Sequence, residues 1–323
     1  LIGFDMGGTS TDVTHFDGEY ERSFETVVAG VRMRAPMMHI HTVAAGGGSL
    51  LTFDGARYRV GPESAGANPG PTSYRRGGPL AVTDCNVMLG KIQPAFFPNI
   101  FGPHADQPLD AAIVRVQFAK LADEITKASG QDYTPTQVAE GFLHIAVENM
   151  ANAIKKISVE KGHDITRYTL NGFGGAAGQH VCLVADALGM ESIFIHPLAG
   201  ILSAYGMGLA DITAIRTATI ETLLNETSQQ TVEKTLEELA QAARDEVVGQ
   251  GVVASKISIV KKVHLRYQGT DTALELIAAP LEQLHADFAD KHKSQFGFVQ
   301  PDGHLVIATV SVEAIGLTGH ATE

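Results

Sequence analysis

The sequence has few cysteines, no long apolar run and no basic cluster, and each of these deficits excludes a class of protein. Cys85 and Cys182 are the only cysteines among 323 residues, which excludes a disulfide scaffold and favours a reducing, cytoplasmic compartment. No apolar stretch approaches the roughly 18 residues of a membrane span, and no signal-peptide pattern is present. We therefore expect no membrane partner.

Basic side chains are also scarce. The chain has 24 Lys and Arg against 36 Asp and Glu, a formal net charge of −12. A chain with this balance and no basic cluster is not expected to bind nucleic acid. The chain begins with Leu1 rather than Met, directly in an apolar run. We therefore expect it to be a piece of a longer protein.

Glycine, in contrast, is abundant and unevenly distributed. Of the 34 glycines, 23 lie in residues 1–90 and 172–208. Glycine concentrates where the backbone turns sharply or approaches a ligand. These two zones are therefore where we expect function.

Periodicity and turn residues predict an α/β lobe followed by a smaller α+β domain. In the lobe we expect strands at 1–5, 13–16, 23–28, 50–53, 57–60, 168–170 and 192–195, and helices at 109–129, 134–162, 178–188 and 200–208. Thr134 and Gln137 fit a capping box with Pro135 at the first helical position. The helix at 200–208 is rich in small residues, which predicts tight packing.

The composition changes near Asp211, which we take as the domain boundary. An acidic helix at 228–248, a helix at 280–295 and strands at 257–267, 272–278 and 305–315 are expected beyond it. The predicted domains are residues 1–212 and 213–323.

The segment Phe4–Val13 carries the strongest chemical pattern. An apolar strand ends in Asp5, two glycines make a turn, and hydroxyl side chains and Asp12 follow. Glycines let backbone N–H groups converge on an anion, hydroxyls add donors, and a carboxylate can hold Mg²⁺. The segment is not a Rossmann or P-loop motif, and a plain Gly-Gly hairpin with a polar tip is the alternative interpretation.

This segment resembles the second phosphate-binding hairpin of the actin-like ATPase superfamily, whose adenosine turn is similar to residues 170–178. A Gly-rich turn needed only for close packing is the alternative there. Residues 5–13, 41–49, 61–71, 77–84, 174–180 and 265–272 together resemble the hydantoinase A/5-oxoprolinase family, and most closely its 5-oxoprolinase branch. Ala177 departs from the family pattern, which usually has Gly there.

The resemblance implies an actin-like (ribonuclease H-like) ATPase lobe and the ATP-dependent opening of a small cyclic amide, with ATP and Mg²⁺ as cofactors. Asp5 would bind Mg²⁺, and Asp12 would orient the phosphoryl acceptor or a water. The expected nucleotide-binding residues are Gly7, Gly8, Thr9, Ser10, Thr11, Gly172, Gly174, Gly175, Ala176, Gly178 and Gln179. Candidate substrate residues are Gly46, Gly47, Gly48, Ser49, Glu63 and Asp84, for which turn-forming roles are the alternative.

The resemblance also implies partners, because actin-like ATPases hold ATP between two phosphate hairpins and this chain has one. We expect the second hairpin in a preceding domain, and the hydrolytic step in a following domain or a B-type subunit. We therefore expect the isolated chain to be inactive. An ATP-dependent hydantoinase or ketone carboxylase subunit, a non-catalytic nucleotide-responsive module and a homo-oligomer stay open.

Several weaker patterns have simple interpretations. His39 and His41 are a conceivable metal pair on one strand face, although a polar pair or an interdomain contact is favoured. Arg75 and Arg76 could bind a carboxylate, although a solvated pair is the favoured interpretation. Cys85 is expected to be buried. Three residues of the second domain are interpreted as interface or turn-stabilising groups, namely Arg266, Thr270 and Asp271.

Overall fold

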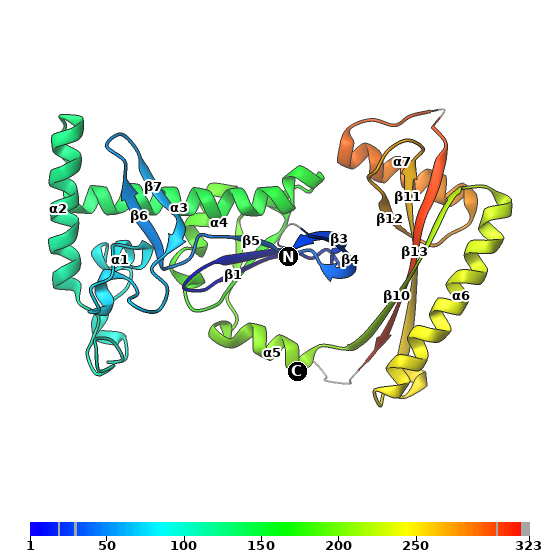
Figure 1. Cartoon of the computed structure of the whole chain (residues 1–323), viewed down its shortest axis with the longest axis horizontal. Helices are drawn as coiled ribbons and strands as arrows, with labels where there is room; N and C mark the ends of the chain where they lie inside the picture. Colours follow the sequence, from blue (N-terminus) through cyan, green and yellow to red (C-terminus); the bar gives the residue numbers. More distant parts are fainter. Residues whose placement is uncertain (19, 29–30, 302, 318–323) are drawn as a thin grey trace. The chain divides into compact units, whose positions relative to one another are not determined.

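The structure, a computed structural model, describes residues 1–18, 20–28, 31–301 and 303–317, without the side chains of 23–28 and 31–36. The chain forms two compact units, Leu1–Ser203 and Ala204–Glu323. Each unit has its own sheet and its own hydrophobic core (Figure 1).

The first unit is built on a five-stranded sheet in the order β5-β2-β1-β8-β9. β2 runs antiparallel to β1 and β5, whereas β8 runs parallel to β1 and β9. This mixed sheet agrees with the predicted α/β lobe. The strands are β1 (Ile2–Met6), β2 (Thr11–His15), β5 (His41–Val43), β8 (Thr169–Phe173) and β9 (Ser192–Phe194).

Alternation of side chains fixes the register of the two central strands. Ile2, Phe4 and Met6 of β1 are fully buried, and so are Thr11 and Val13 of β2. A slip of one residue would turn every one of these side chains to the opposite face of the sheet. The alternation therefore decides which side chains are available at the tip that joins β1 to β2.

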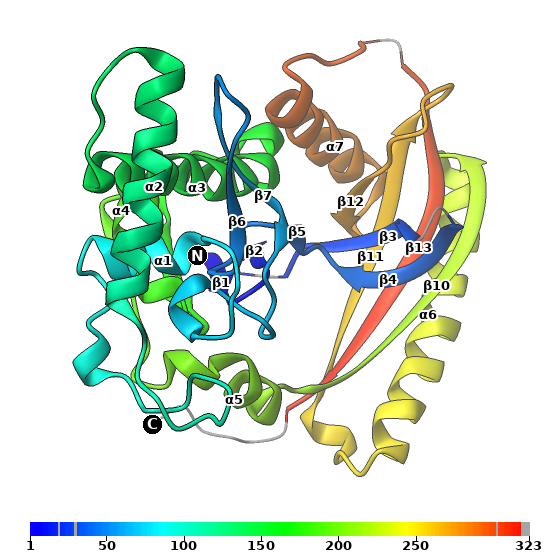
Figure 2. The same cartoon turned by 60° about the vertical axis from the view of Figure 1, so that its left-hand side comes forward.

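Four helices complete the first unit, namely α1 (Val82–Met88), α2 (Ala111–Ser129), α3 (Pro135–Ile157) and α4 (Val181–Leu188). α3 packs against the other three helices and against β2 and β5 (Figure 2). The predicted capping box is confirmed: Thr134 Oγ1 accepts from the Gln137 amide at 3.2 Å, and Gln137 Oε1 accepts from the Thr134 amide at 2.9 Å. The helix ends at Ile157, and a 3₁₀ turn, η3 (Val159–Lys161), precedes Gly162.

Two hairpins extend from this unit. β6 (Ser49–Phe53) pairs with β7 (Tyr58–Ser64), close to the predicted strands. β3 (Arg22–Val28) pairs with β4 (Val31–Met38). The sequence pattern predicts β3 but not β4, β5 or α1. The elements β5 and α1 are short and carry too few periodic residues to stand out, and β4 contains Pro36, which argues against a strand in the sequence.

The helix α5 (Leu202–Leu209) forms where a helix was predicted, but its predicted tight packing is wrong. None of its residues is buried. In the part of the chain that the structure describes, no atom lies within 4 Å of the position that a Cβ would occupy at Gly206 or Gly208. Small residues permit close packing, but they do not show whether a neighbour is there.

The second unit is a four-stranded antiparallel sheet in the order β10-β13-β11-β12. α6 packs against β10 and β13, and α7 packs against β12. The elements are β10 (Ile212–Leu223), α6 (Glu226–Gly249), β11 (Ile257–Tyr267), β12 (Leu274–Ile277), α7 (Leu281–Phe296) and β13 (Leu305–Gly316). β10 was not predicted, whereas the other five lie close to their predicted ranges. α6 extends one residue beyond its predicted end, to Gly249.

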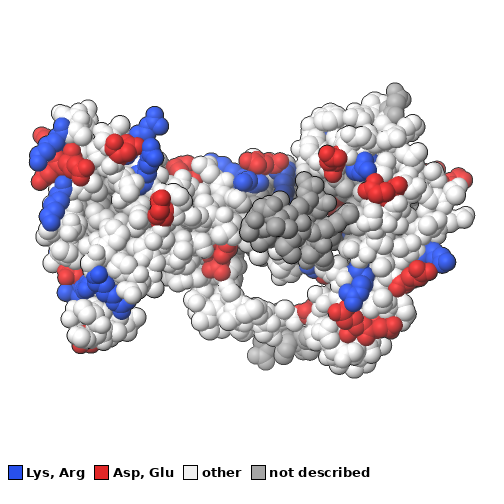
Figure 3. Space-filling model, viewed as in Figure 1, with Lys and Arg blue, Asp and Glu red and all other residues white. Residues whose placement is uncertain are grey.

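Within the described residues, none of the helices combines the length and the apolar character that crossing a bilayer requires. On the faces of the two units that Figure 3 shows, basic and acidic side chains lie in small groups of both signs. No field of a single sign therefore dominates those faces.

Candidate functional site

The β1–β2 hairpin brings the two predicted catalytic carboxylates to the same place. Asp5 and Asp12 are directly opposite in the antiparallel register, so their side chains lie on one face of the sheet. The amide of Gly7 donates to the Ser10 carbonyl at 3.1 Å and closes the turn between them. The hairpin therefore presents two half-buried carboxylates beside a Gly-rich tip.

Among the described residues, each carboxylate has one hydrogen-bond partner. Asp5 Oδ2 accepts from Ser203 Oγ at 2.9 Å, and Asp12 Oδ1 accepts from Thr42 Oγ1 at 2.5 Å. A carboxylate offers about four lone-pair sites, so both groups keep acceptor capacity. Ser203 was not recognised as a site residue, because its contact with Asp5 spans 198 positions of the sequence.

The tip of the hairpin is open. A Cβ added at Gly7 or at Gly8 would meet no atom of the described residues within 4 Å. Thr9 is exposed and Ser10 is half-buried. Thr11 differs, because it is buried and its Oγ1 donates to the Ala45 carbonyl at 2.6 Å. The Thr11 hydroxyl is therefore not available to a phosphate, as the inward position of residue 11 in the strand alternation would have indicated.

The segment Gly46–Ser49 packs directly beneath this tip. The amide of Gly47 donates to the Gly7 carbonyl at 3.2 Å, and that of Gly48 donates to the Gly8 carbonyl at 2.5 Å. The amides of Gly46 and Ser49 bond within the segment. All four N–H groups thus have partners, so they are not free to donate to a substrate, and the turn-forming alternative fits them better. Their glycines allow close backbone contact instead.

The second Gly-rich turn lies beside the first. β8 runs parallel to β1, with Phe173 opposite Asp5, so both strands end at the same edge of the sheet. The Ala176 amide donates to the Met6 carbonyl at 2.9 Å. Gly174 has a φ of +87°, and a Cβ there would lie 2.4 Å from Asp5 Oδ1. The fold therefore joins two motifs that are far apart in the sequence.

The remaining glycines of this turn divide into two kinds. Gly172 packs against Val181 of α4, where a Cβ would lie 2.9 Å from a methyl group. Gly175 and Gly178 face open space. Ala177 begins the 3₁₀ turn η5 (Ala177–Gln179) and is buried. Its right-handed conformation accepts a Cβ without strain, so its departure from the family pattern does not distort the turn.

A buried polar group supports this turn from below. Asn86 Nδ2 donates to Gln179 Oε1 at 2.8 Å and lies 3.0 Å from His180 Nε2. His180 is 1% exposed, and burial lowers its pKa to about 3, with a smaller contribution from Lys91. His180 is therefore neutral and accepts at Nε2. The sequence does not single out Asn86 or His180, because each alone resembles an ordinary core residue.

The two predicted carboxylates outside the turns have different surroundings. Glu63 lies in β7 and is exposed. Asp84 is fully buried and accepts from the amides of Thr72, Ser73 and Ala81 at 2.9–3.0 Å. Burial raises the Asp84 pKa, and those hydrogen bonds oppose the shift. Asp84 therefore caps α1 and does not reach solvent, which does not fit direct contact with a substrate.

Other weak candidates have internal partners. Arg75 pairs with Asp110 at 2.8 Å, and Arg76 donates to the Gly102 carbonyl at 3.1 Å. They are therefore not a freely solvated pair. Cys85 is buried as predicted, and burial raises the pKa of its thiol well above the usual value.

The second unit contains a hollow of about 470 Å³. Arg266 lines it, and donates to Glu221 Oε2 at 2.7 Å and to the Thr270 carbonyl at 3.0 Å. These contacts agree with the turn-stabilising interpretation of Arg266 and Thr270.

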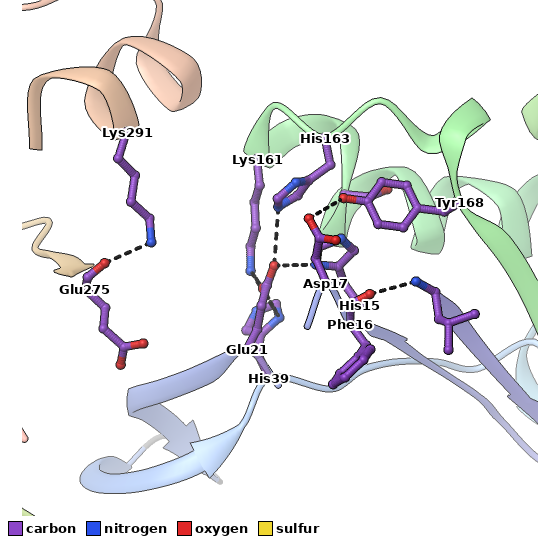
Figure 4. A network of polar contacts seen from close by, with 12 residues as sticks. His15, Phe16, Asp17, Glu21, His39, Lys161, His163, Tyr168, Glu275 and Lys291 are labelled. Atoms are coloured by element: carbon purple, nitrogen blue, oxygen red, sulfur yellow. Dashed lines mark hydrogen bonds and ion pairs between the residues drawn. The ribbon is translucent and has the colours of Figure 1, made fainter. Parts of the chain in front are cut away.

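A second polar cluster lies at the far end of β2, where Glu21 is surrounded by His15, His39, Lys161 and His163 (Figure 4). Glu21 Oε1 lies 2.9 Å from His15 Nδ1 and 3.5 Å from His163 Nε2. Glu21 Oε2 accepts from Lys161 Nζ and lies 3.7 Å from His39 Nδ1. The predicted pairing of His39 with His41 is therefore not the principal contact of His39.

The protonation of this cluster follows from burial and charge. Burial lowers the pKa of His15, and the neighbouring His163 lowers it further, whereas Glu21 opposes the shift. Burial raises the pKa of Glu21, but Lys161 and His15 outweigh it, so that the pKa is lowered overall. A neutral His15 and a charged Glu21 are therefore the stable forms at neutral pH.

Comparison with known proteins identifies relatives that share these motifs. The profile of the family described as Hydantoinase/oxoprolinase matches residues 1–216. The 5-oxoprolinase of Saccharomyces cerevisiae is 42% identical over 323 residues, which cover 99% of this chain and 25% of that protein. This chain thus spans about a quarter of its length.

Two solved structures share the fold. ATP-dependent caprolactamase from Pseudomonas jessenii matches with a TM-score of 0.86 and 27% identity, over 99% of this chain and 47% of that one. Nucleotide-free acetone carboxylase matches with a TM-score of 0.64 and 21% identity, over 98% and 46% of the two chains. The second likeness concerns the fold alone.

Proposed function

Because this chain belongs to the hydantoinase/oxoprolinase family, we propose that it is the nucleotide-binding lobe of an ATP-dependent enzyme that opens the ring of 5-oxoproline. The observation that carries the proposal is the meeting of two Gly-rich turns at one sheet edge, beside the carboxylate of Asp5. The higher identity to a 5-oxoprolinase, 42%, than to a caprolactamase, 27%, supports 5-oxoproline as the substrate.

The open tip of the β1–β2 hairpin fits a phosphate chain. Gly7 and Gly8 leave free the space that a side chain would fill, and the Thr9 and Ser10 hydroxyls can donate to phosphate oxygens. The adenosine would bind along the second turn, where Gly175 and Gly178 face open space. Gly174 brings that turn close to Asp5, so one nucleotide would span both.

Asp5 is suited to hold Mg²⁺, because its carboxylate lies at the carboxyl end of β1 and Ser203 uses only one of its oxygens. When bound, Mg²⁺ neutralises charge on the phosphates. Asp12, on the same face, would orient the phosphoryl acceptor or a water. The protein therefore contributes mainly positioning and charge compensation, which dominate catalysis of phosphoryl transfer.

The proposed reaction makes a poor electrophile reactive. The lactam oxygen attacks the terminal phosphorus of ATP, and ADP leaves. Water then adds to the activated carbonyl carbon, and the ring C–N bond breaks as the nitrogen takes up a proton, which leaves an acyl phosphate. A second water hydrolyses the acyl phosphate and releases the phosphate. The products are glutamate, ADP and phosphate.

The rest of the enzyme would supply what this chain lacks. We assign the opposing phosphate hairpin to a preceding domain, and the hydrolytic step to a following domain or a B-type subunit. The length of the 5-oxoprolinase, of which this chain covers 25%, leaves room for both.

Both cysteines are free, which agrees with a reducing, cytoplasmic compartment.

The test is to measure 5-oxoproline-dependent ADP release by the whole enzyme of which this chain would be one lobe. Asp5→Asn should lower turnover by about 100-fold or more, in the range that loss of a group stabilising the transition state costs. Asp123→Asn is the matched control, because Asp123 is exposed on α2, away from the candidate site residues, and undergoes the same carboxylate-to-amide change. Unchanged turnover in Asp5→Asn would contradict the assignment of Asp5.

Substrate choice and dependence on other domains need two further measurements. Replacing 5-oxoproline with a hydantoin, caprolactam or a ketone should abolish stimulation of ATP hydrolysis. The isolated chain should release no ADP in response to 5-oxoproline. Substrate-dependent turnover by the chain alone would show that the remaining domains are not required.

A further inference from the structure

The cluster around Glu21 has the composition and spacing of a metal site. His15, Glu21 and His163 each offer one ligand atom, and the three atoms lie within 4.8 Å of one another. We propose that these three side chains bind a divalent transition-metal ion such as Zn²⁺. The site lies at the opposite end of β2 from the Gly-rich hairpin tip, and its metal would therefore be separate from the nucleotide's Mg²⁺.

The spacing fits the ligand shell of zinc. Bonds of 2.0–2.1 Å in a tetrahedral site place the ligand atoms about 3.4 Å apart. Glu21 Oε1 lies 2.9 Å from His15 Nδ1 and 3.5 Å from His163 Nε2, on either side of that value. The carboxylate needs no large movement to share an ion with both imidazoles.

The ligand chemistry also favours a transition metal. Imidazole nitrogen suits zinc, copper, iron and nickel, whereas Mg²⁺ and Ca²⁺ prefer oxygen ligands. A site with two histidines and one carboxylate keeps a position open for water. The His163 side chain is 31% exposed, which gives an ion access from solvent.

The second oxygen of Glu21 is held in place independently. Glu21 Oε2 accepts from Lys161 and lies 3.7 Å from His39. Outer partners of this kind orient a ligating carboxylate. The Lys161 ammonium also repels a cation, so we expect an affinity in the micromolar range rather than the tight binding of a dedicated zinc domain.

Two adjustments accompany binding. The hydrogen that the neutral His15 directs from Nδ1 to Glu21 at 2.9 Å must move to the other ring nitrogen, Nε2, so that Nδ1 can bind the ion. The rings of His15 and His163 are stacked, 4.1 Å apart and inclined by 29°. The more exposed His163 must therefore rotate to direct its nitrogen at the ion.

Such an ion would fix distant parts of the first unit to each other. His15 ends β2, Glu21 precedes β3, and His163 follows η3 at the end of α3 (Figure 4). The connection from Glu21 to His163 closes a loop of more than 100 residues, which favours the folded state. We therefore expect the ion to raise the melting temperature of the chain.

The experiment is calorimetric titration of the purified, tag-free chain with ZnCl₂, together with Co²⁺ absorption spectra. Wild type should bind one equivalent, give the intense visible bands of four-coordinate Co²⁺ and melt at a higher temperature with Zn²⁺. His163→Ala and Glu21→Gln should bind more than about 100-fold more weakly, beyond the 10- to 100-fold cost of losing an outer partner. His163 is partly exposed, so its variant should still fold.

His144→Ala is the matched control, because His144 lies on an exposed position of α3 outside the cluster. It should bind Zn²⁺ as wild type does. Equal affinity in wild type, His163→Ala and Glu21→Gln would overturn the proposal, and so would the absence of a Zn²⁺-dependent rise in melting temperature. None of these readouts depends on ATP turnover, so failure here leaves the proposed function unaffected.

Discussion

The glycines at the tips of the two Gly-rich turns face open space, whereas the glycines beneath the hairpin are closely packed. Gly7 and Gly8 at the hairpin tip have no atom within 4 Å of the position that a Cβ would occupy, as is also true of Gly175 in the second turn. Gly46, one layer below the hairpin, would place a Cβ 2.5 Å from the Thr9 backbone. The open glycines leave space for a ligand, whereas the packed one brings two backbone segments together.

This difference shows that glycine content alone does not identify a binding residue. The composition of residues 46–49 predicts a substrate turn. Their amides are all used within the protein, so they support the hairpin. The buried His180 supports the second turn in the same way. We refer to residues 46–49 and His180 together as the supporting layer. Substitutions in this supporting layer should change stability, and substitutions at the open tips should change ligand binding.

The largest effect on stability is expected from acid, through His180. Its pKa is about 3 in the folded protein and about 6.5 when unfolded, so between these values only the unfolded chain takes the proton. The free energy of unfolding should therefore fall as pH decreases from about 6.5, by up to roughly 1.4 kcal/mol per pH unit. Denaturant unfolding at several pH values measures this dependence.

His180→Gln provides the comparison for that measurement. Glutamine keeps an acceptor for Asn86 but does not titrate, so its stability should fall less steeply between pH 6.5 and 4. Parallel curves for wild type and His180→Gln would show that other groups cause the acid sensitivity.

A smaller effect is expected from Gly46→Ala. The added methyl group would meet backbone atoms of Thr9 and Ser10 at 2.5–2.7 Å, and backbone cannot rotate away as a side chain can. We expect a loss of about 2 kcal/mol in the free energy of unfolding, as for overpacking elsewhere. Urea denaturation measures it, and an unchanged midpoint would mean that the two segments are not in close contact.

The smallest effect on stability is expected from Gly8→Ala. Its methyl group would enter open space, so stability should stay within about 0.5 kcal/mol of wild type. In the longer enzyme the same methyl group would occupy the space of a phosphate, and the KM for ATP should rise about tenfold or more, a cost of about 1.4 kcal/mol. A normal KM together with normal stability would remove the hairpin tip from the nucleotide site.

Much of the fold was predictable because it follows from local patterns. The buried alternation of β1 and the capping box at Thr134 depend on residues that are neighbours in the sequence. Surroundings of individual side chains were less predictable. The hydrogen bond from Thr11 Oγ1 to the Ala45 carbonyl and the capping role of Asp84 depend on partners many residues away.

The cluster around Glu21 shows the same limit. Its ligands come from His15, Glu21 and His163, and His163 is separated from the other two by about half of the chain. No spacing rule connects residues at such distances, because folding rather than sequence order brings them together. The sequence pair that looked like a metal site, His39 and His41, is separated in the fold. His39 lies next to Glu21, whereas His41 is the first residue of β5.

The sequence by itself determined the family, the α/β class of the first unit and the two motifs that face a nucleotide in our proposal, because long motifs and periodic burial are local properties. Only the tertiary structure decided which glycines are open, which carboxylate is buried and which histidines meet. Parallel pairing of β1 with β8 places Asp5 opposite Phe173, and that pairing requires the whole sheet to form.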